Sequence, residues 1–213
     1  MTASPDSADL TEFDAPDSSV QPLRMVTGVP GFDRGEAENA VRALLRALGQ
    51  DPDLEHLQQT PRRVADAYAE LLTPEPFNLT TFANDEGYDE LVLARDIPFQ
   101  SLCEHHLLPF HGVAHVGYLP GERIVGLSKL ARVLEQFARR LQVQERLTQQ
   151  VADCLDSHLR PTGVGVVIEA EHQCMSLRGV RAHGSRTVTS ALHGHLRQDP
   201  AARQEFFALV HRR

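Results

Sequence analysis

Two short segments of the sequence hold the side chains best suited to bind a metal. They are Cys103-Glu104-His105-His106 and His172-Gln173-Cys174, and their two thiols and three imidazoles are ligand types that zinc prefers. Either segment alone is a weak signal, because such short patterns occur by chance. The chain has three cysteines, however, and two of them fall in these segments. We therefore expect a zinc site; the alternative is a pair of buried free thiols beside hydrogen-bonded histidines.

The number of ligands bears on the kind of zinc site. A structural site uses four protein ligands, whereas a catalytic site uses three and leaves a position for water. Two cysteines and one histidine would leave two imidazoles free for general acid or base catalysis near neutral pH. Spacing leaves the histidine ligand open: on a strand Cys103 and His105 would share a face, and in a turn Cys103 and His106 would come together.

A second group of side chains is suited to bind phosphate. Ser128 and Lys129 begin a predicted helix, and Arg132 lies one turn later on the face of Lys129. A hydroxyl, a helix N-terminus and two cations form a phosphate site; the alternative is an ordinary helix start with exposed bases. Lys129 is the single lysine among 21 basic residues, which favours a site that needs a compact ammonium group.

Other candidate residues carry weaker signals. Gln144-Glu145-Arg146 begins a further predicted helix, where an acid suits the helix dipole; its carboxylate could also accept two hydrogen bonds from a guanine edge. Cys154 lies on an apolar helical stripe, which predicts a buried structural thiol. The pair Arg62-Arg63 suits a solvated helix face as well as a site. No role is assigned to five isolated histidines, His111, His115, His183, His193 and His195.

Composition excludes several classes of protein. The 213 residues are 41% hydrophobic and 23% charged, a balance typical of a globular chain with a core. We find neither an apolar run of about 18 residues, as a membrane helix needs, nor a secretory leader. The odd number of cysteines argues against a disulfide framework and favours a reducing, cytoplasmic compartment. The net charge is −8, and the five acids of residues 1–23 leave a body of −3, which argues against nucleic-acid binding.

The elements that must position these residues follow from periodicity and capping. Residues 1–30 predict a mobile acidic tail before a single domain over 31–213. One helix is predicted over 34–48. A second helix is predicted to have Thr60 as its N-cap and to end at 73. Strands are predicted at 91–94, 113–118, 124–125, 164–170 and 186–192, and helices over 130–141, over 147–159 and after Asp199-Pro200. The pattern predicts an α+β fold with N-terminal helices over 34–73 and a core over 88–213, in which a helical pair is inserted into an antiparallel sheet.

Several long motifs resemble those of one enzyme family. From about Gly35 to the C-terminus, the chain is similar to GTP cyclohydrolase I in SLCEHHLLPFHG, VGLSKLARVLEQFARRLQVQERLTQQ, EHQCMSLRGVR and GSRTVTS. The resemblance implies a zinc enzyme that converts GTP and water to 7,8-dihydroneopterin triphosphate and formate, the first step of tetrahydrofolate and pterin synthesis. It also implies the tunnelling fold, in which antiparallel sheets of several subunits join into a barrel, and an allosteric, toroidal homodecamer with active sites between subunits.

The resemblance also assigns roles to individual residues. It implies that Cys103, His106 and Cys174 bind zinc and that His105 and His172 are the catalytic pair, with His172 protonating N7 of the purine as water attacks C8. Glu145 would recognise the guanine together with the backbone at Gln144. The triphosphate would be held by Ser128, Lys129, Arg132 and Arg178, with Arg63 joining from another subunit. Ala182-His183 departs from the Lys-Pro-like pair expected before Gly184-Ser185.

Two other functions stay open at this point. One is a non-catalytic zinc protein with four ligands from the two motifs, which would bind zinc tightly and release no formate. The other is a related tunnelling-fold enzyme that acts on a different pterin or a deazapurine. Glu145 suits either purine-like substrate, whereas Ser128, Lys129 and Arg132 favour a triphosphate.

Overall fold

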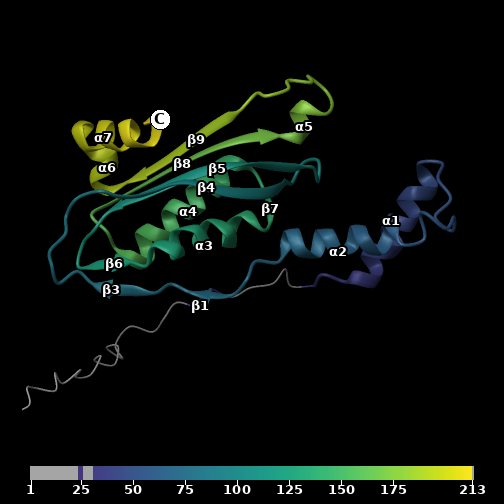
Figure 1. Cartoon of the computed structure of the whole chain (residues 1–213), viewed down its shortest axis with the longest axis horizontal. Helices are drawn as coiled ribbons and strands as arrows, with labels where there is room; N and C mark the ends of the chain where they lie inside the picture. Colours follow the sequence, from purple (N-terminus) through teal and green to yellow (C-terminus); the bar gives the residue numbers. More distant parts are fainter. Residues whose placement is uncertain (1–23, 26–30, 213) are drawn as a thin grey trace, which may run out of the picture.

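The structure, a computed structural model, describes residues 24–25 and 31–212 (Figure 1). Most of the predicted acidic tail lies outside these residues. Within the predicted tail, β1 (Arg24–Met25) pairs antiparallel with β2 (Phe77–Asn78). A strand of two residues is too short to show periodicity, and its partner lies about fifty residues away in the sequence.

Two predicted helices, α1 (Arg34–Ala47) and α2 (Thr60–Leu72), form an arm that projects from the body (Figure 1). Asp33 caps α1 by accepting a hydrogen bond from the Glu36 amide at 2.9 Å. Gly49, with φ of +75°, lies just beyond its end, as the sequence predicts. The N-cap of α2 is Gln59 rather than Thr60, which already lies inside the helix.

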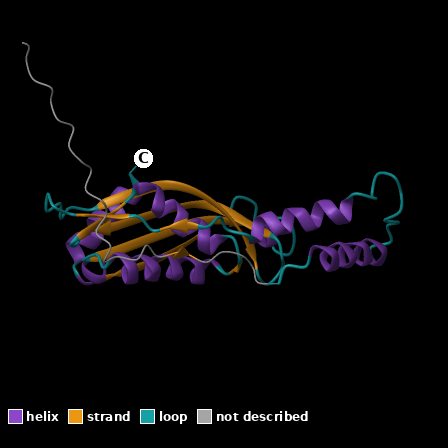
Figure 2. Cartoon of the chain, turned by 90° about the horizontal axis from the view of Figure 1, so that it is seen from below, coloured by secondary structure: helices purple, strands orange, loops and turns teal. Residues whose placement is uncertain are grey.

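A five-stranded sheet forms the body, in the order β7-β4-β5-β8-β9. The long strands β4 (Val92–Cys103), β5 (Pro109–Leu119), β8 (Gly163–His172) and β9 (Thr187–His193) are antiparallel neighbours. The short strand β7 (Leu141–Gln142) runs parallel to the end of β4. The sheet curves strongly along its length (Figure 2).

The inserted pair, α3 (Leu127–Ala138) and α4 (Gln144–Leu159), covers one face of this sheet. Its buried stripes include Leu130, Leu134, Leu147 and Leu155, and they pack on the sheet residues of the main core. This confirms the predicted helical pair but corrects the end of its first helix, which is predicted at 141 and lies at Ala138. Leu141 belongs to β7, because its pairing with Leu102 of β4 overrides the helical period.

The opposite face is covered by the C-terminal helices α6 (Gly194–Gln198) and α7 (Pro200–His211) (Figure 1). Asp199 caps α7 by accepting a hydrogen bond from the Ala201 amide at 2.7 Å, which confirms the predicted start at Asp199-Pro200. The predicted strand at 124–125 is β6 (Arg123–Val125), which pairs with β3 (Thr81–Ala83) in a separate two-stranded sheet. Within the described part of the chain, every helix is too short or too polar to span a membrane.

Candidate metal centre and catalytic pocket

A tight turn between β4 and β5 gathers the first metal-binding segment. The Cys103 carbonyl accepts a hydrogen bond from the Leu107 amide at 2.9 Å, and the Cys103 amide donates to the Leu108 carbonyl at 2.9 Å. Leu107 adopts a φ of +53°, so the chain reverses within a few residues. Both imidazoles therefore approach the Cys103 sulfur: Nδ1 of His106 lies 3.6 Å from Sγ, and Nδ1 of His105 lies 3.9 Å from it.

The end of β8 brings the second segment to the same edge of the sheet. His172 lies opposite Phe110 in the β5–β8 register, and the short helix α5 (Gln173–Ser176) turns Cys174 toward the first segment. One ligand atom each from Cys103, His106 and Cys174 lies within 4.8 Å of the others. The two segments thus converge as predicted, and the turn geometry selects His106 rather than His105 for this group.

The donor set and spacing of this Cys-His-Cys group fit zinc. With ordinary Zn–S and Zn–N bond lengths and tetrahedral angles, a sulfur and a nitrogen ligand lie about 3.6 Å apart, which matches the distance between Cys103 Sγ and His106 Nδ1. Burial and the adjacent Cys103 thiol raise the pKa of Cys174. A divalent cation would relieve this repulsion by stabilising both thiolates. Three protein ligands leave a fourth position for water.

The two remaining histidines of these segments lie in contrasting environments. The His172 ring stacks on Phe110, with centroids 4.6 Å apart and planes within 5°, and burial lowers its pKa although Glu145 acts to raise it. The His105 side chain is exposed, and its Nε2 lies 3.8 Å from a carboxylate oxygen of Glu104. Of the two imidazoles that the resemblance leaves free of zinc, His172 is therefore half-buried and His105 is exposed to solvent.

A cavity of about 240 Å³ adjoins the metal group. Its wall contains both spare histidines and the start of α4, where the exposed Glu145 lies. The cavity therefore combines a candidate metal site, two imidazoles and a carboxylate in a space that could admit part of a ligand. The lining residues are Cys103, His105, His106, Gln142, Val143, Gln144, Glu145, His172, Cys174, Met175 and Thr187.

Sequence reasoning missed a pair of charged residues that anchors the turn. Arg146 of α4 forms an ion pair with Glu104, and its hydrogen bond lowers the pKa of that carboxyl group. The same guanidinium donates to the Gln142 side chain and to the Leu141 carbonyl, each at 2.9 Å. Arg146 thereby ties the turn to β7 and α4. The partners are 42 residues apart, so no local pattern could reveal them.

The predicted phosphate residues lie apart from this cavity. Ser128, Lys129 and Arg132 occupy the first half of α3, beside β3 and β6, whereas the end of α3 leads to β7 next to Cys103. A helix of 12 residues is about 18 Å long. Lys129 Nζ lies 5.9 Å from the centroid of the Phe77 ring, and Arg132 pairs with Glu75 at 2.8 Å.

The two other predicted phosphate ligands lie on separate segments. Arg63 is exposed in the first turn of α2. Arg178 follows α5, and its charge acts to lower the pKa of Cys174 against the larger effect of burial. Arg178 is therefore the predicted phosphate ligand whose charge reaches the metal group.

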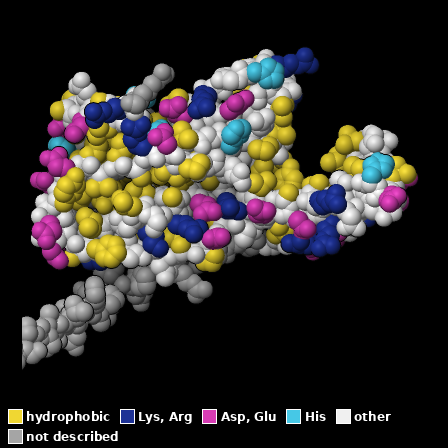
Figure 3. Space-filling model, viewed as in Figure 1, with side chains coloured by type: hydrophobic (Ala, Val, Ile, Leu, Met, Phe, Trp, Pro, Cys, Tyr) yellow, Lys and Arg dark blue, Asp and Glu magenta, His cyan; other side chains and the backbone are white. Residues whose placement is uncertain are grey.

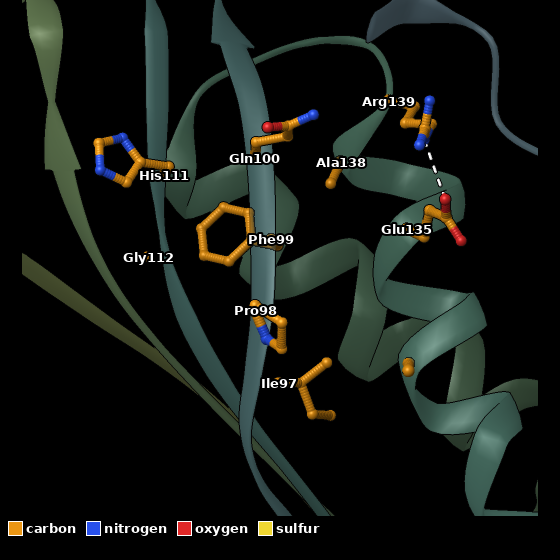
Figure 4. A pocket seen from close by; sticks show the side chains of 10 residues that line it. Ile97, Pro98, Phe99, Gln100, His111, Gly112, Glu135, Ala138 and Arg139 are labelled. Atoms are coloured by element: carbon orange, nitrogen blue, oxygen red, sulfur yellow. Dashed lines mark hydrogen bonds and ion pairs between the residues drawn. The ribbon is translucent and has the colours of Figure 1, made fainter. Parts of the chain in front are cut away.

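A larger cavity, of about 600 Å³, lies between β4 and α3 (Figure 4). Ile97 and Phe99 of β4 line it opposite Ala138. Its one acidic side chain, Glu135, pairs with its one basic side chain, Arg139, at 3.0 Å. This cavity does not include the Cys-His-Cys group and offers no unpaired carboxylate or guanidinium for a charged ligand among the residues described.

Comparison with known proteins is consistent with this geometry. The model of the GTP cyclohydrolase I family matches residues 37–211. GTP cyclohydrolase 1 of Streptomyces avermitilis is 58% identical over 186 residues, which cover 84% of this chain and 91% of that protein. GTP cyclohydrolase 1 of Mycolicibacterium gilvum is 54% identical over 189 residues, which cover 86% and 94%.

A relative of lower identity and a solved structure extend the comparison. GTP cyclohydrolase 1 of Dehalococcoides mccartyi is 50% identical over 184 residues, which cover 84% of this chain and 97% of that protein. Among solved structures, the archaeosine synthase QueF-Like in the apo form is 16% identical and covers 49% of this chain and 93% of its own, with a TM-score of 0.39. That score is too low to establish a shared fold.

Proposed function

This chain belongs to the GTP cyclohydrolase I family, and from that premise we propose which of its residues perform the reaction. The resemblance noted in the sequence motifs is thereby confirmed. The chain is an enzyme, a hydrolase that opens GTP at C8 and rearranges it to 7,8-dihydroneopterin triphosphate and formate, the first step of tetrahydrofolate and pterin synthesis. The observation that carries the residue assignment is the Cys-His-Cys group beside a cavity that contains two further histidines and Glu145.

Cys103, His106 and Cys174 would hold Zn²⁺, and His105 and His172 would move protons. Zinc bound there supplies Lewis-acid chemistry that makes water a nucleophile near neutral pH. His172, half-buried and of lowered pKa, would donate a proton to N7 of the purine as water attacks C8. The exposed His105 would move protons near the reacting atoms, and formate would leave after a second hydrolytic step.

Glu145 would recognise the base and a basic group would hold the triphosphate. The exposed Glu145 carboxylate at the cavity wall suits the two N–H donors of a guanine edge. Ser128, Lys129, Arg132 and Arg178 would bind the phosphates, with Arg63 from a neighbouring copy. The length of α3 between Lys129 and the metal group supports a site completed by another subunit.

We further propose that the subunits assemble into the toroidal homodecamer of the tunnelling fold. In support, β9 forms one edge of the five-stranded sheet, and β4 lies at the other edge except where β7 covers its end. Such edges offer unpaired backbone groups to strands of a second copy. The free thiols of Cys103, Cys154 and Cys174 support a reducing compartment, the cytoplasm.

Incubation of the purified, zinc-loaded protein with GTP tests the proposal. We expect formate and a pterin that fluoresces after oxidation, in equal amounts. The His172→Ala variant should yield neither at a comparable rate while it retains zinc. Zinc that binds tightly in a protein that releases no formate would instead favour the non-catalytic alternative.

A further inference from the structure

Gln144, at the start of α4, uses its side chain for a purpose that the sequence does not reveal. The sequence suggested only that its backbone assists guanine recognition. In the structure the side chain is 1% exposed and points into the sheet. Its Nε2 lies 3.0 Å from the Ile168 carbonyl, 2.9 Å from the Thr187 carbonyl and 3.1 Å from the Thr189 hydroxyl, so its two N–H groups serve three acceptors and one bond is shared.

These contacts determine which end of the amide faces His172. Backbone carbonyl oxygens can only accept hydrogen bonds, so the Gln144 side-chain nitrogen must face the Ile168 and Thr187 carbonyls. A flipped amide would set its oxygen against two carbonyl oxygens in a buried place, which costs free energy for every unmade bond. The amide oxygen of Gln144 therefore faces His172, whose Nε2 lies 2.7 Å away.

The orientation of the amide in turn determines the tautomer of His172. An amide oxygen is an acceptor without a proton to give, so a hydrogen bond of this length requires a proton on Nε2 of the imidazole. In the neutral ring the proton then sits on Nε2, and Nδ1 carries the lone pair. Nδ1 is thus the nitrogen of His172 that remains available to a ligand. A proton that His172 donates to N7 must first bind Nδ1, because the Nε2 proton stays bonded to Gln144.

The surrounding residues hold this arrangement rigid. The Thr148 hydroxyl donates to the backbone carbonyl of Gln144 at 2.8 Å and lies 2.6 Å from the Thr189 hydroxyl. Because the Gln144 side-chain amide also reaches Thr189, it belongs to a satisfied buried network. The stacked Phe110 fixes the plane of the His172 ring. Phe110 sets the plane and Gln144 sets the rotation within that plane, which leaves the imidazole one orientation.

We propose that Gln144 is a positioning residue for His172, which it holds as the Nε2–H tautomer with Nδ1 presented to the substrate. The tautomer concerns the protein without substrate, whereas the consequence for turnover rests on the proposed function. Gln144 acts through His172 and makes no side-chain contact with the base. It should therefore affect the rate of the reaction rather than the affinity for GTP.

Nitrogen NMR tests the tautomer without reference to activity. The zinc-loaded protein would be labelled with ¹⁵N-histidine and measured in the solid state at pH 8, with the His172 signals assigned by their loss in His172→Gln. We expect a protonated Nε2 and an unprotonated Nδ1. A protonated Nδ1 would overturn the proposal, and because the wild-type protein suffices, this test does not depend on the folding of a Gln144 variant.

Kinetics of Gln144→Met, which preserves the shape of the side chain and removes its polar atoms, test the consequence. We expect kcat to fall about tenfold to a hundredfold, as is typical when a group that orients a histidine is removed. KM for GTP, the preference for GTP over ITP and the zinc content should stay within about twofold. The matched control is Gln149→Met on the same helix, whose exposed amide bonds Asp153 and which should leave kinetics unchanged.

The outcomes separate this proposal from the proposed function. A raised KM with an unchanged kcat, or a lost preference for GTP over ITP, would show that the Gln144 side chain reads the base and would contradict positioning. Unchanged kinetics would contradict it as well. If the wild-type protein released no formate from GTP, the proposed residue roles would fail, while the NMR result would still decide the tautomer.

Discussion

Two cysteines with equal burial show how position in the fold determines the chemistry of a thiol. Cys103 and Cys154 are each 6% exposed. Cys103 ends a strand beside His106 and Cys174, whereas Cys154 lies on the buried stripe of α4, where burial raises its pKa to about 11. The first thiol is placed to bind a cation and the second is a packing residue, as the apolar stripe around it predicts.

Cys154 should therefore be unreactive in the folded protein. At pH 8 a thiol with a pKa near 11 is about a hundredfold less ionised than an ordinary cysteine. We expect iodoacetamide to modify Cys154 at least a hundredfold more slowly in the folded protein than in urea, as followed by mass spectrometry. Equal rates in the two states would show that the thiol is accessible and not packed in the core.

Substitutions in the two metal-binding segments should fall into two classes. Cys103→Ser, Cys174→Ser and His106→Ala should empty the zinc site and abolish turnover, because they remove a ligand. His105→Ala and His172→Ala should keep about one zinc per chain while turnover falls roughly 10²–10⁴-fold. Metal analysis beside a formate assay distinguishes the classes, with Cys154→Ser as the control that keeps both. Loss of zinc from His105→Ala but not from His106→Ala would reverse the ligand assignment.

Substitutions of Lys129 and Glu145 should impair nucleotide binding in different ways. Lys129→Ala should bind GTP less tightly and distinguish it less from GDP, because the ammonium group that we propose to contact phosphate is lost. Glu145→Ala should lose base recognition, so ITP, which lacks the exocyclic amine, would be penalised less relative to GTP. Affinities for the three nucleotides measure this; an identical loss for all three in both variants would contradict the two roles.

At the scale of elements, an irregularity in β4 depends on a buried histidine. The β4–β5 register shifts between Ala94 and Ile97, and Asp96 adopts a φ of +54°. The Asp96 amide donates a hydrogen bond to Nδ1 of His115 at 3.3 Å, and this imidazole is 3% exposed. A nitrogen that accepts a hydrogen bond must be unprotonated, so the irregularity favours neutral His115.

His115 should make the protein less stable in acid. Burial lowers its pKa below 6.5; Asp96 and Glu169 act to raise the pKa, and Arg95 and His211 act to lower it. The unfolded chain then binds the proton more readily, so the free energy of unfolding falls as pH drops below about 6.5, by at most about 1.4 kcal/mol per pH unit. His115→Gln should flatten this dependence in urea titrations between pH 5 and 7.5. The exposed His183→Gln is the control, and an equal slope in both variants would contradict a role for His115.

At the scale of the whole molecule, the α1–α2 arm leaves hydrophobic side chains uncovered. α1 has no buried residue, and Leu44 is 56% exposed. Hydrophobic side chains gather at the end of this arm (Figure 3). Covering the apolar stripe of an amphipathic helix stabilises it in water. This supports contacts of the arm with other copies in the proposed oligomer.

A charge on this stripe should weaken assembly. Leu44→Asp places a carboxylate where an apolar contact is expected, and an unpaired charge in an interface costs several kcal/mol. Light scattering should report a smaller particle mass for this variant than for the wild type. Asn39→Asp adds the same charge elsewhere on α1, where the side chain is exposed and polar, and should leave the mass unchanged. Equal masses for all three proteins would exclude this stripe from the interface.

Local signals in the sequence determined much of this protein by themselves. The start of α7 follows from Asp199 and Pro200, and the end of α1 from Gly49, because capping depends on a few neighbouring residues. The stripes of α3 and α4 follow from helical periodicity. The residue types of the candidate metal group and the family were also evident, since they depend on residue identity and order.

Other features were decided by tertiary structure alone. The turn after Cys103 brings His106 into the metal group, where spacing left two histidines open. Leu141 joins a strand because Leu102 lies beside it. Gln144 faces His172 because β8 and β9 supply acceptors for its amide from residues 24 to 45 positions away. Each depends on partners distant in the chain, whose positions local propensity and periodicity cannot specify.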